Sequence, residues 1–304
     1  MQENQVSVTA LVTAYARAYH ATHDDPKIFN DFLAHHMFTE QERSYLGHNL
    51  AESLKFFDLE RAALCPDQAT ALAWVIQTYN GSTTLSRSRY TEDSLEVVAK
   101  QGVQQYIILG AGMDTFAFRR PDMVGQLQVF EVDHPGTQAF KLSRLAELGW
   151  EHPAELHFIP VDFTEESLEE ALKHSSYDPQ KLSFFSWLGV TMYLTRDEVF
   201  DTLRSIASIA PAGSAVIFDY YDTDAFDPEK ASKRAQLTQE IVRRTGEPMK
   251  TGFKPSTLAT DIAALGLRLH ENLSPADIEA RYFQGRTDNY HAFEHVHFAW
   301  TVVA

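Results

Sequence analysis

One short apolar run, residues 106–109, constrains the fold of this chain more than any other feature. It is brief enough for a buried parallel strand, and Gly110, Ala111 and Gly112 follow it directly. A Gly-x-Gly turn lets bare backbone approach a ligand, and the free N–H groups of a helix that begins near Thr115 would face the same place. This combination is typical of a nucleotide-type cofactor site.

A second predicted strand, at residues 128–135, carries acidic side chains at its end. Asp133 lies 21 positions after Gly112, which is the spacing at which a doubly wound fold presents a carboxylate to a pair of ribose hydroxyls. A Gly-x-Gly turn alone would also fit simple packing between a strand and a helix. The strand before the turn and the acid after it favour a cofactor site.

Composition and charge limit the class of protein. The chain has 304 residues, of which 44% are hydrophobic and 22% are charged, as is ordinary for a soluble globular protein. Its 26 Lys and Arg residues against 42 Asp and Glu residues give a net charge of −16, which disfavours nucleic acid as a partner. No apolar stretch approaches the roughly 18 residues of a membrane span, and the single cysteine excludes an internal disulfide. We therefore expect a cytoplasmic protein, with its oligomeric state left open.

The N-terminal part of the chain predicts only helices. Apolar residues recur at intervals of three and four residues up to about position 80, which is the period of an amphipathic helix. We expect residues 1–80 to form a helical cap or lid, with Asp67 as the cap of its last helix. Residues 80–82 then predict a turn, after which a helix from Ser86 leads into the glycine-rich strand.

From residue 104 onward, predicted strands and helices alternate. Strands are expected at 104–109, 127–132, 156–161, 182–187 and 214–220, and helices near 115–120 and at 136–148, 165–173 and 196–209. Such alternation predicts parallel strands joined by right-handed crossovers, so that their C-terminal ends open on one side and form the ligand crevice.

The C-terminal part of the chain departs from this alternation. Residues 222–265 are polar and helical in pattern, and we interpret them as an insertion. Two final strands, from Leu265 and Glu294, are expected to form an antiparallel pair at the sheet edge or next to it. The fold class predicted for residues 81–304 is therefore α/β, with a doubly wound, Rossmann-like sheet that is mostly parallel.

The residue at position 115 helps to distinguish between two classes of cofactor. A nicotinamide fingerprint has a third glycine three positions after the second, and this chain has Thr115 there. S-Adenosylmethionine has no pyrophosphate to cradle, so a methyltransferase needs only the Gly-x-Gly turn and the acid at the strand end. A nicotinamide-dependent oxidoreductase is the alternative, because it would use the same turn and Asp133.

Five sequence blocks occur in order between about Ser86 and Tyr220. They are SRSRYTED, ILGAGMDTFAFRR, FEVDHPGTQAFK, FIPVDF and SWLGVTMYLT. Together they resemble the leucine carboxyl methyltransferase family and its bacterial relatives, which are S-adenosylmethionine-dependent O-methyltransferases. The resemblance implies a class I methyltransferase domain that uses S-adenosylmethionine to methylate a carboxyl or hydroxyl group of a small-molecule acceptor.

The resemblance also implies which residues bind the two ends of the cofactor. Arg87 would pair with the methionine carboxylate, with Arg89 as the less favoured candidate. The alternative for both arginines is a local ion pair on their own helix with Glu92 or Asp93.

The other cofactor contacts follow from the same resemblance. The turn at 110–112 would border the methionine moiety, and Asp133 would bind the ribose hydroxyls. Asp162 and Phe163 would hold the edge and the face of the adenine. Asp162 could instead be only the cap of a helix that begins near Glu165.

One position departs from the family pattern. Many family members have a glutamate where this chain has Leu188, which we place among the cofactor-binding residues. A polar contact would be lost there, so a non-catalytic S-adenosylmethionine-binding module is a further alternative. A hydroxyl acceptor would need a base, and His291, Tyr193 and Tyr221 are its first candidates, although the sequence assigns no catalytic residue.

Three histidines near the C-terminus could suggest a metal site. His295 and His297 lie on one face of a predicted strand, and His291 precedes them. A third ligand with a supporting carboxylate is not evident in the sequence. We therefore interpret these residues as surface histidines of an edge strand and expect no bound metal.

Overall fold

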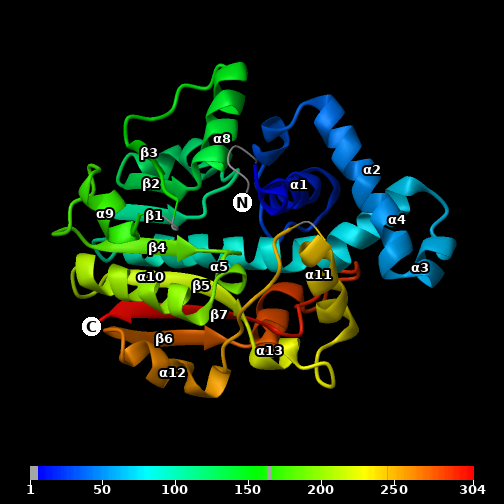
Figure 1. The fold of residues 1–304 in the computed structure, drawn as a ribbon. Coiled ribbons are helices and arrows are strands. Elements are labelled where there is room, and N and C mark those ends of the chain that lie inside the picture. The colour runs from blue at the N-terminus through cyan, green and yellow to red at the C-terminus, as the bar shows by residue number, and fades with distance from the viewer. Residues whose placement is uncertain (1–5, 163–165, 245) are drawn as a thin grey trace.

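Seven strands form one sheet at the centre of the protein (Figure 1). The structure, a computed structural model, describes residues 6–162, 166–244 and 246–304. The strand order is β3-β2-β1-β4-β5-β7-β6. The strands are β1 (Gln105–Leu109), β2 (Gln128–Asp133), β3 (Leu156–Pro160), β4 (Ser183–Trp187), β5 (Ala215–Tyr221), β6 (Leu267–Leu273) and β7 (Val296–Val303).

Pairing in this sheet follows the pattern expected from the sequence. The first five strands pair in parallel, whereas β7 pairs antiparallel with both β5 and β6. The prediction of a doubly wound, mostly parallel α/β sheet with an antiparallel C-terminal edge is therefore confirmed.

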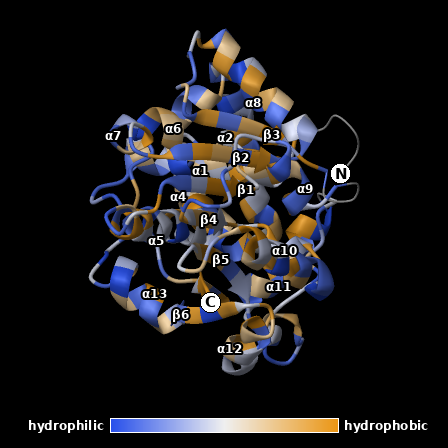
Figure 2. Cartoon of the chain, turned by 90° about the vertical axis from the view of Figure 1, so that its left-hand side faces the viewer, coloured by the Kyte–Doolittle hydropathy of each residue, from blue (hydrophilic) through white to orange (hydrophobic). Residues whose placement is uncertain are grey.

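Helices cover both faces of the sheet, which is why β1 is buried along its whole length. Tyr106 and Ile108 belong to the apolar core that includes side chains of α5 (Gly81–Ala99). Ile107 and Leu109 point to the opposite face and belong to the core that includes α10 (Arg196–Ile209). Figure 2 shows mainly hydrophobic residues on the central strands and mixed colouring on the helices around them.

The remaining helices complete the two outer layers and the C-terminal part. They are α6 (Phe116–Arg119), α7 (Pro121–Val124), α8 (Pro135–Glu147), α9 (Leu168–Lys173), η3 (Thr191–Tyr193), η4 (Thr223–Phe226), α11 (Lys233–Arg244), α12 (Pro255–Ala263), α13 (Pro275–Ile278) and η5 (Glu279–Phe283). The alternation of strands and helices from residue 104 is as predicted. Within the described residues, none of the helices is both long enough and apolar enough to cross a membrane.

The N-terminal region is helical, as predicted. Its elements are α1 (Val8–His23), η1 (Ala34–Met37), α2 (Glu40–Phe57), α3 (Leu59–Leu64), α4 (Gln68–Val75) and the π-helical η2 (Ile76–Asn80). Tyr15 and Met37 form a third core with Met113 and Leu145, so this region packs against the loop after β1 and against α8. Asp67 caps α4 by accepting a hydrogen bond from the Thr70 N–H at 2.8 Å, as expected.

The turn predicted at residues 80–82 is wrong. Helices α4, η2 and α5 follow one another without a break from Gln68 to Ala99. A Cβ atom on Gly81 would lie 2.7 Å from the Tyr290 ring and 2.8 Å from the Ile76 carbonyl oxygen, so this glycine permits close packing within a helix. The division into a helical cap at 1–80 and a methyltransferase domain at 81–304 stays a prediction, and its boundary would fall inside this continuous helix.

Candidate active site

A cavity of about 510 Å³ opens at the C-terminal ends of the parallel strands. The walls include one residue at or just after the end of each of the strands β1 to β4, namely Gly110, Asp133, Asp162 and Leu188. The chain winds outward from β1 in both directions, toward β2 on one side and β4 on the other. Doubly wound sheets bind their ligands at this reversal point, so the cavity lies where the sequence places the crevice.

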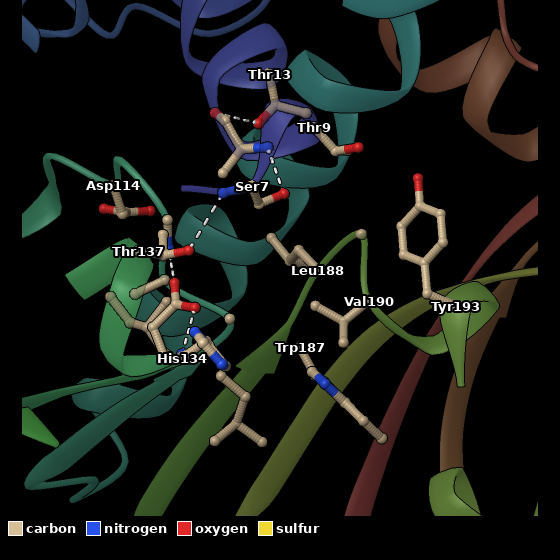
Figure 3. A pocket seen from close by; sticks show the side chains of 18 of the residues that line it. Ser7, Thr9, Thr13, Asp114, His134, Thr137, Trp187, Leu188, Val190 and Tyr193 are labelled. Carbon is tan, nitrogen blue, oxygen red and sulfur yellow. Dashed lines mark hydrogen bonds between the residues drawn. The ribbon is translucent and has the colours of Figure 1, made fainter. Parts of the chain in front are cut away.

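The start of α1 and the segment 246–250 form the roof of the cavity. Ser7 donates a hydrogen bond to Glu247 Oε1 at 2.9 Å, and the Thr9 hydroxyl donates to the second oxygen of the same carboxylate. The Ser7 N–H donates to Thr137 Oγ1 at 3.4 Å. Figure 3 shows Ser7 and Thr9 above Leu188 at the edge of the pocket. One carboxylate therefore ties two distant segments together above the site.

The glycine turn needs glycine for both conformation and space. Gly110 and Gly112 have φ angles of 70° and 52°, in the left-handed region that side chains disfavour. A Cβ atom on Gly110 would lie 2.6 Å from the side chain of Val190. Both glycines and Ala111 line the cavity, so bare backbone faces it as expected from the sequence.

Asp133 lies directly against this turn. Its Oδ2 accepts a hydrogen bond from the Gly112 N–H at 2.5 Å, and its Oδ1 accepts one from the His134 N–H at 2.7 Å. Burial raises the pKa of Asp133 above its ordinary value, and the two N–H donors only partly oppose this effect. Additional donors such as ribose hydroxyls would stabilise the carboxylate further.

Asp162, which follows β3, lines the same cavity. Its Oδ2 lies 3.6 Å from His134 Nε2. Helix α9 begins at Leu168, and its cap is Ser167. The alternative that Asp162 caps a helix beginning near Glu165 stays a prediction, because residues 163–165 lie outside the described residues. Phe163, the predicted partner of the adenine face, lies outside the described residues.

The arginines of α5 have different partners. Arg87 lines the cavity and its Nη1 donates to Asp219 Oδ2 at 2.8 Å. Arg89 instead forms an exposed pair with Asp93, with 2.9 Å between Nε and Oδ2, and Glu92 pairs with Arg119. The local ion pair considered as an alternative thus exists for Arg89, whereas Arg87 is directed toward the site.

The loop after β4 supplies the other wall. Leu188, Val190 and Tyr193 line the cavity (Figure 3). Burial raises the pKa of Tyr193 to about 12, although the adjacent Thr9 hydroxyl lowers it, so Tyr193 is a hydrogen-bond donor at neutral pH. Tyr221 and His291, the other candidate bases, lie outside the described lining of this cavity.

The interpretation of the C-terminal histidines as surface residues is wrong. His295 and His297 are both buried, and strand β7, which contains His297, lies between β5 and β6 and is not an edge strand. His295 Nδ1 lies 2.9 Å from Asp222 Oδ1, and His297 Nε2 lies 3.6 Å from the other oxygen of that carboxylate. The Ser232 N–H donates to His295 Nε2 at 3.0 Å. Across the described part of the chain, no group of three His, Cys, Asp or Glu side chains could hold a metal ion.

Three residues near the cavity were missed at the level of sequence. Thr9 and Glu247 come from segments without a motif, so nothing local marks them. Asp219 could have been found, because it lies near the C-terminal end of a predicted strand that is parallel to the strand of Asp133. An acid at a second strand end was the available signal.

Comparison with known proteins agrees with this geometry. Residues 10–207 match the family described as leucine carboxyl methyltransferase. YktD of Bacillus subtilis (strain 168), whose name places it among S-adenosyl-L-methionine-dependent methyltransferases, is 39% identical over 303 residues, which cover 99% of each chain.

Two crystal structures share the fold at 12% identity. One, from Thermobifida fusca YX and described as a methyltransferase, has a TM-score of 0.60 and covers 99% of this chain and 96% of its own. The other, a duf574 family protein from Streptomyces avermitilis MA-4680, has a TM-score of 0.59 with coverages of 96% and 97%.

The sheet, the cavity and these likenesses define the class as an S-adenosylmethionine-dependent methyltransferase with a Rossmann-like fold. The nicotinamide-dependent oxidoreductase is not supported. Within that class, the chain belongs to the leucine carboxyl methyltransferase family.

Proposed function

We propose that this enzyme transfers the methyl group of S-adenosylmethionine to an oxygen atom of a small molecule, in a carboxyl or hydroxyl group. The observation that carries the proposal is the order of groups along one cavity. Arg87 of α5 lines this cavity, and the glycine turn, Asp133 and Asp162 follow at the ends of the neighbouring strands β1, β2 and β3. That order matches the carboxylate, methionine, ribose and adenine parts of the cofactor.

Each of these residues has a chemical task in the proposal. The Arg87 guanidinium would bind the methionine carboxylate with paired hydrogen bonds. Asp133 would accept hydrogen bonds from the ribose hydroxyls, and Asp162 would accept one from the adenine amino group. When bound, S-adenosylmethionine supplies a methyl group on a sulfonium that leaves as a neutral thioether.

The rest of the cavity would receive the acceptor. Val190, Leu194 and Pro248 give it apolar surface, whereas Tyr193 and Glu247 give it polar groups. Alignment of the acceptor and exclusion of water can together lower the barrier by roughly 7–11 kcal/mol. A carboxylate acceptor is already ionised at neutral pH and needs no base. For a hydroxyl acceptor, Glu247 and Glu198, which both line the cavity, are carboxylates that could take the proton.

Methyl transfer from radiolabelled S-adenosylmethionine to paired acceptors tests the proposal. Each pair would share a scaffold and differ only in a carboxyl or a hydroxyl group. A base-labile product indicates a methyl ester, and a base-stable product indicates an ether. The matched control is Arg87→Ala, which should lose activity at limiting cofactor. Tight binding of S-adenosylhomocysteine without turnover on any acceptor would favour the non-catalytic module.

A further inference from the structure

Asp219 joins two walls of the cofactor cavity through one buried carboxylate. It lies near the C-terminal end of β5 and its side chain is fully buried. Its Oδ2 accepts a hydrogen bond from Arg87 Nη1 at 2.8 Å, and its Oδ1 accepts one from the Gly189 N–H at 2.6 Å. Arg87 belongs to α5 and Gly189 to the loop after β4, so Asp219 fixes both relative to the sheet.

Gly189 confines the same guanidinium from a second direction. Its φ angle is 73°, and a Cβ atom there would lie 2.8 Å from Arg87 Cζ. The arginine head group therefore lies against bare backbone on one side and is bonded to Asp219 through Nη1. Within the part of the chain that the structure describes, Arg87 donates a hydrogen bond through Nη1 alone, so its Nη2 and Nε donors are available to a ligand in the cavity.

A negative charge beside an anion-binding arginine has two opposite consequences. It weakens the attraction of the guanidinium for an anionic ligand, since the two charges largely neutralise each other. The negative charge also holds the Arg87 guanidinium in one orientation, so the side chain loses less conformational freedom when a carboxylate binds. The sign of the effect on ligand affinity shows which consequence dominates.

We propose that Asp219 is a positioning residue for the amino-acid end of the cofactor. It acts through Arg87 and Gly189 and does not itself touch the ligand. This inference rests on the proposed function, in which Arg87 binds the methionine carboxylate. Asp219 thus contributes to recognition of that carboxylate through the arginine that makes the contact.

A comparison of two ligands isolates this role. S-Adenosylhomocysteine has the amino-acid group, whereas 5′-methylthioadenosine keeps the adenosine and the sulfur but lacks it. In calorimetric titrations, Asp219→Asn should weaken binding of S-adenosylhomocysteine by about tenfold to a hundredfold, as expected for a lost hydrogen bond to a charged group. Binding of 5′-methylthioadenosine should change by less than about twofold, because that ligand does not reach Arg87.

Two control variants separate this effect from general destabilisation. Tyr220→Phe removes a hydrogen bond to Asn272 from the next residue of the same strand, which points to the other face. Asp93→Asn breaks the exposed pair with Arg89 on the same helix as Arg87. Both should leave the ratio of the two affinities unchanged. If Asp219→Asn does not fold, Asp219→Glu keeps the charge but moves it by one methylene, and it should lower the same ratio.

The outcomes are distinct. Unchanged or tighter binding of S-adenosylhomocysteine by Asp219→Asn would overturn the inference, because charge compensation alone would then describe the pair. Equal weakening of both ligands would also overturn it, in favour of a general structural role. Arg87→Ala tests the underlying proposal separately: if that variant keeps the wild-type ratio, Arg87 does not bind the amino-acid end. A change in Arg87→Ala but none in Asp219→Asn would refute only the role of Asp219.

Discussion

The Asp133 carboxylate accepts a 2.5 Å hydrogen bond from the backbone N–H of Gly112, 21 residues earlier in the chain. This bond joins the end of β2 to the turn after β1, the two segments that line the centre of the cavity. Since the carboxylate is largely buried, its charge is stabilised chiefly by the two backbone donors around it.

Asp133→Ala should therefore weaken binding of S-adenosylhomocysteine by about 1.5–3 kcal/mol, the usual size of a lost hydrogen bond to a charged group. The domain should still fold, because the site lies at a strand end. Calorimetric titration measures the affinity and thermal melting measures the stability. An unchanged affinity would show that Asp133 only supports the turn.

The matched control for this variant is Glu131, two residues earlier on the same strand. It is buried and paired with Lys141, whose ammonium also donates to the Asp114 carbonyl oxygen at 2.6 Å. Removal of one partner leaves the other charge buried without compensation. Glu131→Gln should consequently lower stability more than cofactor affinity, and the reverse result would contradict our assignment of the two acids.

Arg87→Lys should lose much of the cofactor affinity, and Arg87→Ala should lose more. A guanidinium meets a carboxylate with two parallel hydrogen bonds, whereas an ammonium offers a single compact charge. Arg89→Ala is the control, because that side chain is exposed and pairs with Asp93 outside the cavity. Titrations of S-adenosylhomocysteine that give all three variants the wild-type affinity would remove Arg87 from the site.

Gly189→Ala should reduce both stability and cofactor binding. A positive φ costs a side-chain residue about 1–2 kcal/mol, and the added Cβ would also displace the Arg87 guanidinium. Gly149 is the matched control, since it has a φ angle of 65° but nothing within 4 Å of its would-be Cβ. Gly149→Ala should show only the loss of stability, so equal ligand affinities in the two variants would argue against the contact with Arg87.

Glu247→Ala should loosen the roof of the cavity. It removes the acceptor of the hydrogen bonds from Ser7 and Thr9, so the first turn of α1 should exchange its amide hydrogens faster. Hydrogen exchange measured by mass spectrometry checks this. The control is Glu240→Ala, whose carboxylate pairs with Arg243 and Arg244 on its own helix. Equal protection of α1 in both variants would show that Glu247 does not hold the roof.

Asp24 should make stability depend on pH in the acid range. Burial alone would raise its pKa, but hydrogen bonds from His20, Tyr290 and Gln77 outweigh this and hold the pKa below the ordinary value of 3.8. A lowered pKa stabilises the folded state at pH values above 3.8, and this contribution is lost as the pH falls through the folded-state value. Asp24→Asn should thus cost about 1–3 kcal/mol at pH 7 and progressively less below pH 4, as measured by urea unfolding. A constant difference would contradict the assignment.

Local patterns were sufficient to predict most of the fold. Helix α10 begins at Arg196 and ends at Ile209, as predicted, because its apolar spacing and the capping box of Thr195 and Glu198 are both local signals. The strands of the parallel sheet were found for a similar reason, since a short apolar run bounded by turn residues is itself the mark of a buried strand.

The errors arose where distant residues decide the outcome. The local sequence around Gly81 predicts a turn, but this glycine lies inside a continuous helix, where Tyr290, 209 positions later, packs against it. The buried His295 contacts Asp222 and Ser232, which lie 73 and 63 positions earlier in the chain, and the sequence around His295 alone does not specify these contacts. Arg87 and Asp219 are 132 residues apart, so their pairing becomes visible only in the folded chain.

Because the helix from Gln68 to Ala99 is continuous, α4 and Arg87 would have to move together. A lid hinged at residue 80 would have to bend this helix, and Arg87 would move with it away from Asp219. Opening the site at the contact between Ser7 and Glu247 requires only that a few side-chain hydrogen bonds break. We therefore expect the cofactor to enter through the roof and not through rotation of the whole N-terminal region, so that Arg87 stays in place while the ligand enters.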